Sequence, residues 1–168
     1  MAEKNYSGAE GIEKVRELIK DVHIAMLTTV AEDGALRARP MANPDRPFDG
    51  TLWFITRIDS SKTDEIRHDS EVLVSYAEPK DGKYIALSGR ASIVRDRAQI
   101  HEHWTPAAKA WFPEGEDDPA AALIQVSVDS AEYWDANRST IVRLAKLAIA
   151  SVTGADKTSV GDSGRITV

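Results

Sequence analysis

The chain has no cysteine among its 168 residues. This absence excludes disulfide bonds, zinc–thiolate sites, iron–sulfur clusters and thiol catalysis. It fits the reducing cytoplasm, where we expect the protein to reside. Histidine is also scarce, with four residues. His101 and His103 would point about 200° apart on a helix, so we expect surface or capping roles for them and no metal site.

Long hydrophobic runs and an excess of positive charge are missing as well. No stretch approaches the roughly 18 apolar residues of a membrane span, and residues 1–20 lack the apolar core of a signal peptide. The net charge is −6, which argues against a nucleic-acid-binding surface. The acidic cluster at 114–118 lacks the ligand spacing of an EF-hand, and we expect it to be a solvated loop.

The composition is that of a folded domain. Apolar residues make up 42% of the chain and charged residues 29%, both ordinary values for globular proteins, and we expect one domain over residues 1–168. The capping-box pair Ser7 and Glu10 precedes a helical pattern that continues to Ile19. Further helices are predicted from Ser60 or Ser61 through His68 and at 96–104, 106–111 and 141–152. The C-terminal helix and tail begin at about residue 139, and the tail from Gly154 is expected to be loosely held.

Strand patterns occupy most of the remaining chain. Strands are predicted at 23–30, 36–41, 51–56, 72–77, 84–94 and 123–128, with 132–134 as a candidate extension of the last. Asp33-Gly34 is a hairpin turn signal between the first two. Because most strands follow one another without an intervening helix, the order favours an antiparallel barrel with helices outside and excludes a doubly wound parallel sheet.

Two features of the sequence could bind an anion. Arg37 and Arg39 are two residues apart on one predicted strand and therefore share a face, although such a pair is equally typical of a solvated strand. Ser60, Ser61 and Lys62 stand at a predicted helix start, where hydroxyl groups, an amine and free N–H groups suit a phosphate. The same three residues also fit a plain helix cap with an exposed lysine.

Together and in this order, these segments resemble the flavin-binding split barrel of the pyridoxamine 5'-phosphate oxidase superfamily. The resemblance rests on RPM at 39–41, LWFIT at 52–56, SSK at 60–62 and IALSG at 85–89, and it covers about residues 15–134. The segments WFPEGEDDP at 111–119 and EYWD at 132–135 look like the bacterial general stress protein branch of that superfamily.

The resemblance implies a mostly β fold with flanking helices, an antiparallel split β-barrel, that binds FMN. It also implies a symmetric homodimer with the flavin at the subunit interface. Arg39 and Lys62 would hold the FMN phosphate, with the hydroxyl groups of Ser60 and Ser61. The positions that match the cofactor site of the family, with Trp111 added as an aromatic candidate from either subunit, are Arg39, Pro40, Met41, Phe54, Ile55, Thr56, Ser60, Ser61, Lys62 and Trp111.

Three departures from the oxidase pattern limit what carries over. Ser61 stands where the oxidase has an arginine, Ile55 replaces a tyrosine, and the tail has no R-x-H substrate motif. The resemblance therefore implies an FMN-binding general stress protein, a flavin-dependent oxidoreductase of unknown substrate, and no oxidation of pyridoxamine phosphate. Two alternatives stay open: a flavin-binding module without turnover, and a deazaflavin-dependent reductase on the same barrel. A haem-binding barrel is the weaker alternative, since no histidine has an obvious pocket position.

Overall fold

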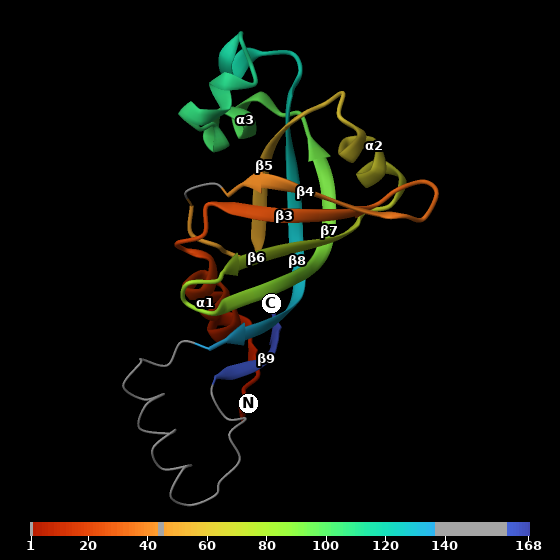
Figure 1. Ribbon diagram of the computed structural model, residues 1–168. Helices are drawn as coiled ribbons and strands as arrows, with labels where there is room; N and C mark the ends of the chain where they lie inside the picture. The colour runs from red at the N-terminus through yellow and green to blue at the C-terminus, as the bar shows by residue number, and fades with distance from the viewer. Residues whose placement is uncertain (1, 44–45, 137–160) are drawn as a thin grey trace, which may run out of the picture.

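The computed structural model describes residues 2–43, 46–136 and 161–168 (Figure 1). The helices are α1 (Gly8–Ile19), α2 (Ser61–His68) and α3 (Arg97–His103), with 3₁₀ helices η1 (Pro106–Ala110) and η2 (Gly115–Asp117). The strands are β1 (Ala2–Glu3), β2 (Tyr6–Ser7), β3 (Ile24–Val30), β4 (Leu36–Ala42), β5 (Thr51–Arg57), β6 (Glu71–Glu78), β7 (Lys83–Val94), β8 (Ala121–Asp135) and β9 (Asp162–Thr167). Within these ranges no helix is both long and apolar enough to cross a membrane.

The strands form a single mixed sheet in the order β1-β9-β8-β7-β6-β3-β4, and β5 pairs with β8 on a separate branch. All pairings among β3 to β8 are antiparallel, whereas β1 and β2 run parallel to β9. In the described ranges no ladder joins β4 to β5. The mostly β class with flanking helices is confirmed. The antiparallel split β-barrel stays a prediction, because the sheet of the described residues is mixed and not closed.

The main core lies on one face of this sheet. Leu27, Val74, Leu87 and Val126 project from four different strands and are all 0% exposed. Helix α1 covers this face with Val15, which is also fully buried. Ser7 is the N-cap residue of α1, as predicted, but its side chain forms no capping hydrogen bond.

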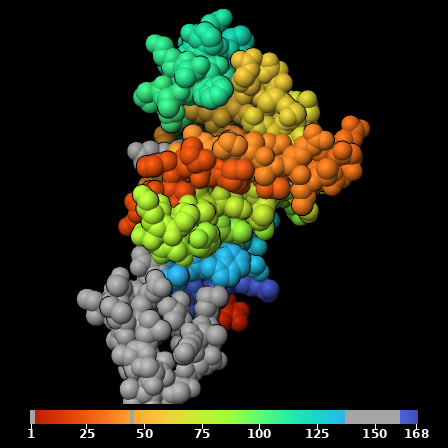
Figure 2. Space-filling model, viewed as in Figure 1, coloured from red at the N-terminus to blue at the C-terminus, as the bar shows by residue number. Residues whose placement is uncertain are grey.

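A smaller apolar cluster joins α3 and η1 to the far end of the sheet. Ile100, Ala108 and Phe112 pack there against Leu123 of β8. In Figure 2 this part forms a separate lobe beside α2. The predicted helix at 96–104 is confirmed as α3, and the second helical piece is the 3₁₀ helix η1.

Three expectations about chain ends and loops need correction or lie outside the structure. The expectation of a loosely held tail is wrong for residues 162–167. Strand β9 pairs there with β8 and with β1, and Ile166 is fully buried. The acidic cluster contains η2, and Asp118 is buried with its carboxylate accepting a hydrogen bond from the Ala120 N–H. The helix predicted at 141–152 lies outside the described residues.

Candidate functional site

Six of the ten residues matched to a flavin site lie along two strands that each have one unpaired edge. Among the described strands, β4 pairs only with β3, and β5 pairs only with β8. Arg39, Pro40 and Met41 belong to β4, and residues 54–56 belong to β5. Backbone N–H and C=O groups on these edges are therefore available to a ligand.

Helix α2 begins where the sequence predicted it. Ser60 is the N-cap residue, but no side chain caps the helix, because the Ser60 hydroxyl donates instead to the Arg57 carbonyl at 2.8 Å. Thr63 is fully buried, and its hydroxyl lies 2.8 Å from the Ile58 carbonyl oxygen. These two hydrogen bonds from side-chain hydroxyl groups to backbone carbonyls hold the turn between β5 and α2 in place. First-turn N–H groups without intrahelical partners remain at the positive end of the helix dipole.

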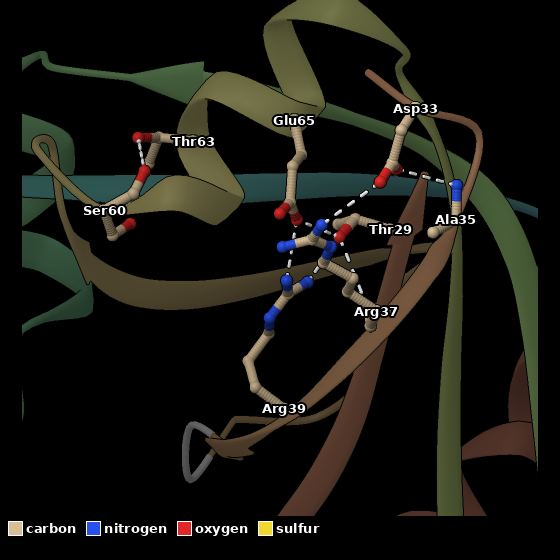
Figure 3. Close-up of polar contacts among 8 residues, drawn as sticks. All are labelled: Thr29, Asp33, Ala35, Arg37, Arg39, Ser60, Thr63 and Glu65. Carbon is tan, nitrogen blue, oxygen red and sulfur yellow. Dashed lines mark hydrogen bonds and ion pairs between the residues drawn. The ribbon is translucent and has the colours of Figure 1, made fainter. Parts of the chain in front are cut away.

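Arg39 lies beside this helix and belongs to a buried polar network that the sequence did not reveal (Figure 3). Its guanidinium donates to Glu65 Oε2 at 2.7 Å and to the Thr29 hydroxyl, and Thr29 in turn donates to Glu65 Oε2 at 2.5 Å. The side chains of Arg39 and Glu65 are 20% and 8% exposed. Burial alone would raise the pKa of Glu65, but the hydrogen bonds from Thr29 and Arg39 lower it below its usual value. Arg37 is more exposed and pairs with Asp33.

Lys62 is half-buried, which differs from the exposed lysine that a helix start predicts. Burial lowers the pKa of its ammonium group, and the positive charge of Arg39 lowers it further. In the described part of the chain it forms no ion pair. The structure therefore brings two cations together at the start of α2. Among the described residues only Arg39 forms an ion pair there, while Glu65 and Asp59 attract the Lys62 ammonium group at longer range and partly offset the lowering of its pKa.

A groove of about 540 Å³ separates α2 from the β3–β4 hairpin, which protrudes beside the helix in Figure 2. Its lining residues are Ala31, Glu32, Asp33, Arg37, Ser61, Asp64, Glu65 and His68. Four carboxylates outnumber the cations there, and neither Arg39 nor Lys62 belongs to the lining. The groove itself is thus a poor anion site, and an anion would lie on the Lys62 side of the helix start.

The side chains of β5 pack alternately into the main core and into the smaller apolar cluster under α3. Phe54 is 1% exposed and packs in the main core, while Ile55 packs against the smaller cluster under α3. Thr56 is 4% exposed, and its hydroxyl has no hydrogen-bond partner among the described residues. The side chains of Phe54 and Thr56 are therefore both buried, and this strand would meet a ligand mainly through its backbone.

Trp111 lies at the end of η1, on the lobe formed with α3. Its side chain is 73% exposed, whereas the adjacent Phe112 is 2% exposed. Within one subunit a tryptophan this exposed is costly and often marks a contact surface. Its assignment to the flavin site stays a prediction.

His103 was expected at the surface or in a cap, and that expectation is wrong. The residue is 7% exposed, and its imidazole stacks on Trp53 with ring centroids 4.4 Å apart and planes 19° apart. Burial lowers the pKa of the imidazole, and the charge of Arg46 lowers it further. Its Nδ1 atom has no hydrogen-bond partner in the described chain, an arrangement that costs about 1–3 kcal/mol. His101 faces the other way and pairs with Asp117 at 3.0 Å.

We expect His103 to make the protein acid-sensitive. Because its folded pKa lies below the usual 6.5, the unfolded chain binds a proton first, and stability falls as the pH drops below about 6.5. Replacing His103 with leucine should remove this loss between pH 6.5 and 5 while leaving the slope below pH 4.5 in place. Urea unfolding midpoints measured at several pH values test this. If the urea midpoints of both proteins fall equally between pH 6.5 and 5, the His103 imidazole does not cause the loss of stability.

The chain is similar to known proteins in both sequence and fold. The sequence profile described as "Pyridoxamine 5'-phosphate oxidase like" matches residues 10–158. The chain is 31% identical over 138 residues to Protein bli-3 of Neurospora crassa, an alignment that covers 77% of this chain and 66% of that protein.

Two crystal structures extend the comparison. One is General Stress Protein 26 from Bacillus anthracis, with 27% identity, a TM-score of 0.64 and coverage of 73% of this chain and 92% of that chain. The other is the general stress FMN/FAD binding protein from Xanthomonas citri, with 27% identity, a TM-score of 0.67 and coverage of 79% and 93%.

Proposed function

Because the chain belongs to the pyridoxamine 5'-phosphate oxidase-like family, we propose that it is an FMN-binding general stress protein that acts as a flavin-dependent oxidoreductase. The similarity to the FMN/FAD binding protein of Xanthomonas citri supports a flavin as the ligand. When bound, FMN would supply the redox chemistry, and the protein would supply position and electrostatics.

The observation that carries this proposal is the ammonium group of Lys62. It is half-buried, carries no carboxylate partner in the described chain and lies at an uncapped helix start near Arg39. A lysine at the positive end of a helix dipole is unfavourable unless an anion compensates it. The FMN phosphate, with close to two negative charges, would remove that penalty and accept hydrogen bonds from the first-turn N–H groups.

Arg39 and the two strand edges support the same placement. Although Arg39 is bonded to Glu65 and Thr29, a guanidinium has five N–H donors, so it can contact the phosphate as well. The unpaired edges of β4 and β5 offer further polar groups of the backbone to the flavin. In this arrangement β3 to β8 would form the antiparallel split barrel of the family.

The test compares FMN with riboflavin, which lacks the phosphate. A charge-assisted hydrogen bond contributes about 1.5–3 kcal/mol, so Lys62→Ala should weaken FMN binding roughly ten- to hundredfold. Riboflavin affinity should barely change. Titration by flavin fluorescence quenching measures both ligands.

Lys80→Ala serves as the matched control, since Lys80 is an exposed lysine in the β6–β7 turn. It should leave both affinities unchanged. Equal losses for riboflavin and FMN in Lys62→Ala, or no loss for FMN, would show that the phosphate does not bind there.

We further propose that the protein forms a homodimer through the outer face of the sheet. Ile24 and Met26 on β3 are 54% and 40% exposed, and Tyr84 and Trp134, which are cross-strand partners on β7 and β8, are 43% and 41% exposed. Their strand neighbours on the opposite face fill the main core. Large apolar side chains gathered on one exposed face are typical of an interface.

Met26→Asp is expected to break this dimer. Each subunit would bury a carboxylate in an apolar contact, so dimerisation should weaken at least ~10-fold. If the flavin is shared between subunits, FMN is released on dilution as the subunits separate. Light scattering and FMN fluorescence across a dilution series measure both. A monomer with full FMN affinity would contradict the shared site.

A further inference from the structure

The Arg39 guanidinium, on β4, is held by side chains from two other elements. Its Nη1 atom donates to the Thr29 hydroxyl on β3, and its Nη2 atom donates to Glu65 Oε2 on α2 at 2.7 Å. The Thr29 hydroxyl donates in turn to Glu65 Oε2, so the three side chains form a closed ring of hydrogen bonds (Figure 3). Because the guanidinium is planar and both of its terminal nitrogen atoms are engaged, these contacts fix the plane in which it lies.

Thr29 and Glu65 are out of reach of a ligand, whereas Arg39 is not. Thr29 is 0% exposed and the Glu65 side chain 8%, compared with 20% for the Arg39 side chain. The contacts with Thr29 and Glu65 use two of the five N–H donors of a guanidinium. Within the described chain the other three donors remain for a ligand. Thr29 and Glu65 can therefore contact a bound anion only through Arg39.

Stability alone is a weak reason for an ion pair at this place. Burying two charges costs free energy because they lose their water, and apolar residues of similar volume often stabilise a protein as much or more. The pair does, however, fix the end of a long side chain that would otherwise sample many rotamers. What the pair of Arg39 and Glu65 secures is thus the place of one positive charge, beside helix α2.

The charge of Glu65 also offsets the repulsion between Arg39 and Lys62. Burial lowers the pKa of Lys62, and the positive charge of Arg39 lowers it further, while the carboxylates of Glu65 and Asp59 raise it. These charges come from β4, from α2 itself and from the turn before α2. Without the Glu65 carboxylate, the two cations would repel each other more strongly and Arg39 would be free to turn into solvent.

We propose that Thr29 and Glu65 are positioning residues of the flavin phosphate site, which hold the Arg39 guanidinium beside the ammonium group of Lys62. This inference rests on the proposed function, because it concerns the same phosphate. Neither residue contacts the flavin, and each acts through Arg39. A guanidinium that is already held in place loses less conformational entropy when the phosphate binds, which increases the affinity.

Thr29→Val tests this role, because valine has nearly the shape of threonine but no hydroxyl group. Arg39 loses one of its two contacts, so the affinity for FMN should fall about three- to tenfold. The affinity for riboflavin, which has no phosphate, should hardly change, whereas a merely structural role would lower both affinities together. Thr28→Val, the same change at the half-buried neighbouring position on the other face of β3, is the control and should alter neither affinity.

The same change in the Arg39→Met protein shows whether Thr29 acts through Arg39. If it does, adding Thr29→Val should leave the FMN-to-riboflavin affinity ratio of Arg39→Met unchanged, because two residues that act as one unit have non-additive effects. Fluorescence-quenching titrations of the parent, the two single variants and the double variant complete the cycle. An equal fall of the ratio in both backgrounds, or no fall in the parent background, would overturn the proposal.

Glu65→Gln gives a second readout that does not depend on Thr29→Val. Glutamine can still accept a hydrogen bond from Arg39 but carries no charge, so the pKa of Lys62 should fall further below its usual value. The affinity ratio should therefore begin to fall at a lower pH than in the parent as the pH is raised. Using the ratio cancels the titration of the isoalloxazine ring, which both flavins share. Identical pH profiles of the two proteins would overturn the role of Glu65.

Lys62→Ala separates this inference from the proposed function. If Lys62→Ala lowers the affinity ratio and Thr29→Val does not, the phosphate site stands and the positioning role is wrong. If the parent binds FMN and riboflavin equally, both are wrong. A ratio that falls in Lys62→Ala and in Thr29→Val, but not further when Thr29→Val is added to Arg39→Met, is the result that we expect.

Discussion

Gly89→Ala is expected to destabilise the protein by about 3 kcal/mol or more, at the upper end of the cost of overpacking. A Cβ atom at this position would lie 2.2 Å from the Ser127 carbonyl oxygen and 3.0 Å from the Val128 Cα atom. Both are backbone atoms of β8, and β7 is held on its other side by β6. The added methyl group therefore has to displace a central strand at the point where the β7–β8 register shifts.

Thermal unfolding should show this as a fall in Tm of roughly 6–12 °C for a chain of this size. Ser88→Ala, at the exposed preceding position, serves as the control, and its Tm should stay close to that of the parent protein. Gly164→Ala places a Cβ atom 2.1 Å from the Lys4 carbonyl oxygen, but it should cost less because β1 pairs only with β9. A Gly89→Ala protein as stable as the Ser88→Ala protein would contradict the close approach of β7 and β8.

Arg39→Met is expected to lower both the stability of the protein and its affinity for FMN. It leaves the Glu65 carboxylate buried with only the Thr29 hydroxyl as a partner. Removing one member of a buried ion pair costs about 3–5 kcal/mol, and the partial exposure of Arg39 places the expected loss near the lower value. FMN affinity should fall about tenfold in addition, because one phosphate donor is lost.

The double variant Arg39→Met with Glu65→Gln separates charge from packing. Since glutamine needs no counter-charge, we expect the second change to restore at least half of the lost stability, although FMN binding stays weak. The pH dependence gives an independent readout. In the parent, the lowered pKa of Glu65 means that its stabilisation is lost as the pH falls below its usual 4.5. Additive losses in the double variant would contradict the ion pair.

The sequence predicted the elements that have strong local signals. Asp33-Gly34 defines the β3–β4 hairpin, and the apolar period after Ser7 defines α1. Strand β9 was missed because the tail from Gly154 is rich in glycine, serine, threonine and aspartate, which gave no strand pattern. Its stability comes from pairing with β8 and β1 and from burial of Ile166, which are tertiary effects. For the same reason β8 continues past Asp129 and Ser130, where the pattern suggested an interruption.

The sequence predicted where some of the candidate site residues lie in the fold. The strand-to-helix order placed Lys62 at the start of α2 correctly. The pairing of Arg39 with Glu65 joins residues 26 positions apart, and nothing local in the sequence signals it. His103 comes three residues after the core residue Ile100, so the two side chains share one face of α3. That spacing could have identified it as buried, but not as stacked on Trp53.

Flavin binding at the start of α2 is tested by a titration of the unmodified, flavin-free protein with FMN and with riboflavin. We predict saturable binding of one FMN per chain, with riboflavin bound at least about tenfold more weakly because it lacks the phosphate that Lys62 compensates. Equal affinities for the two flavins, or no binding of either, would show that the protein does not hold an FMN phosphate at Lys62.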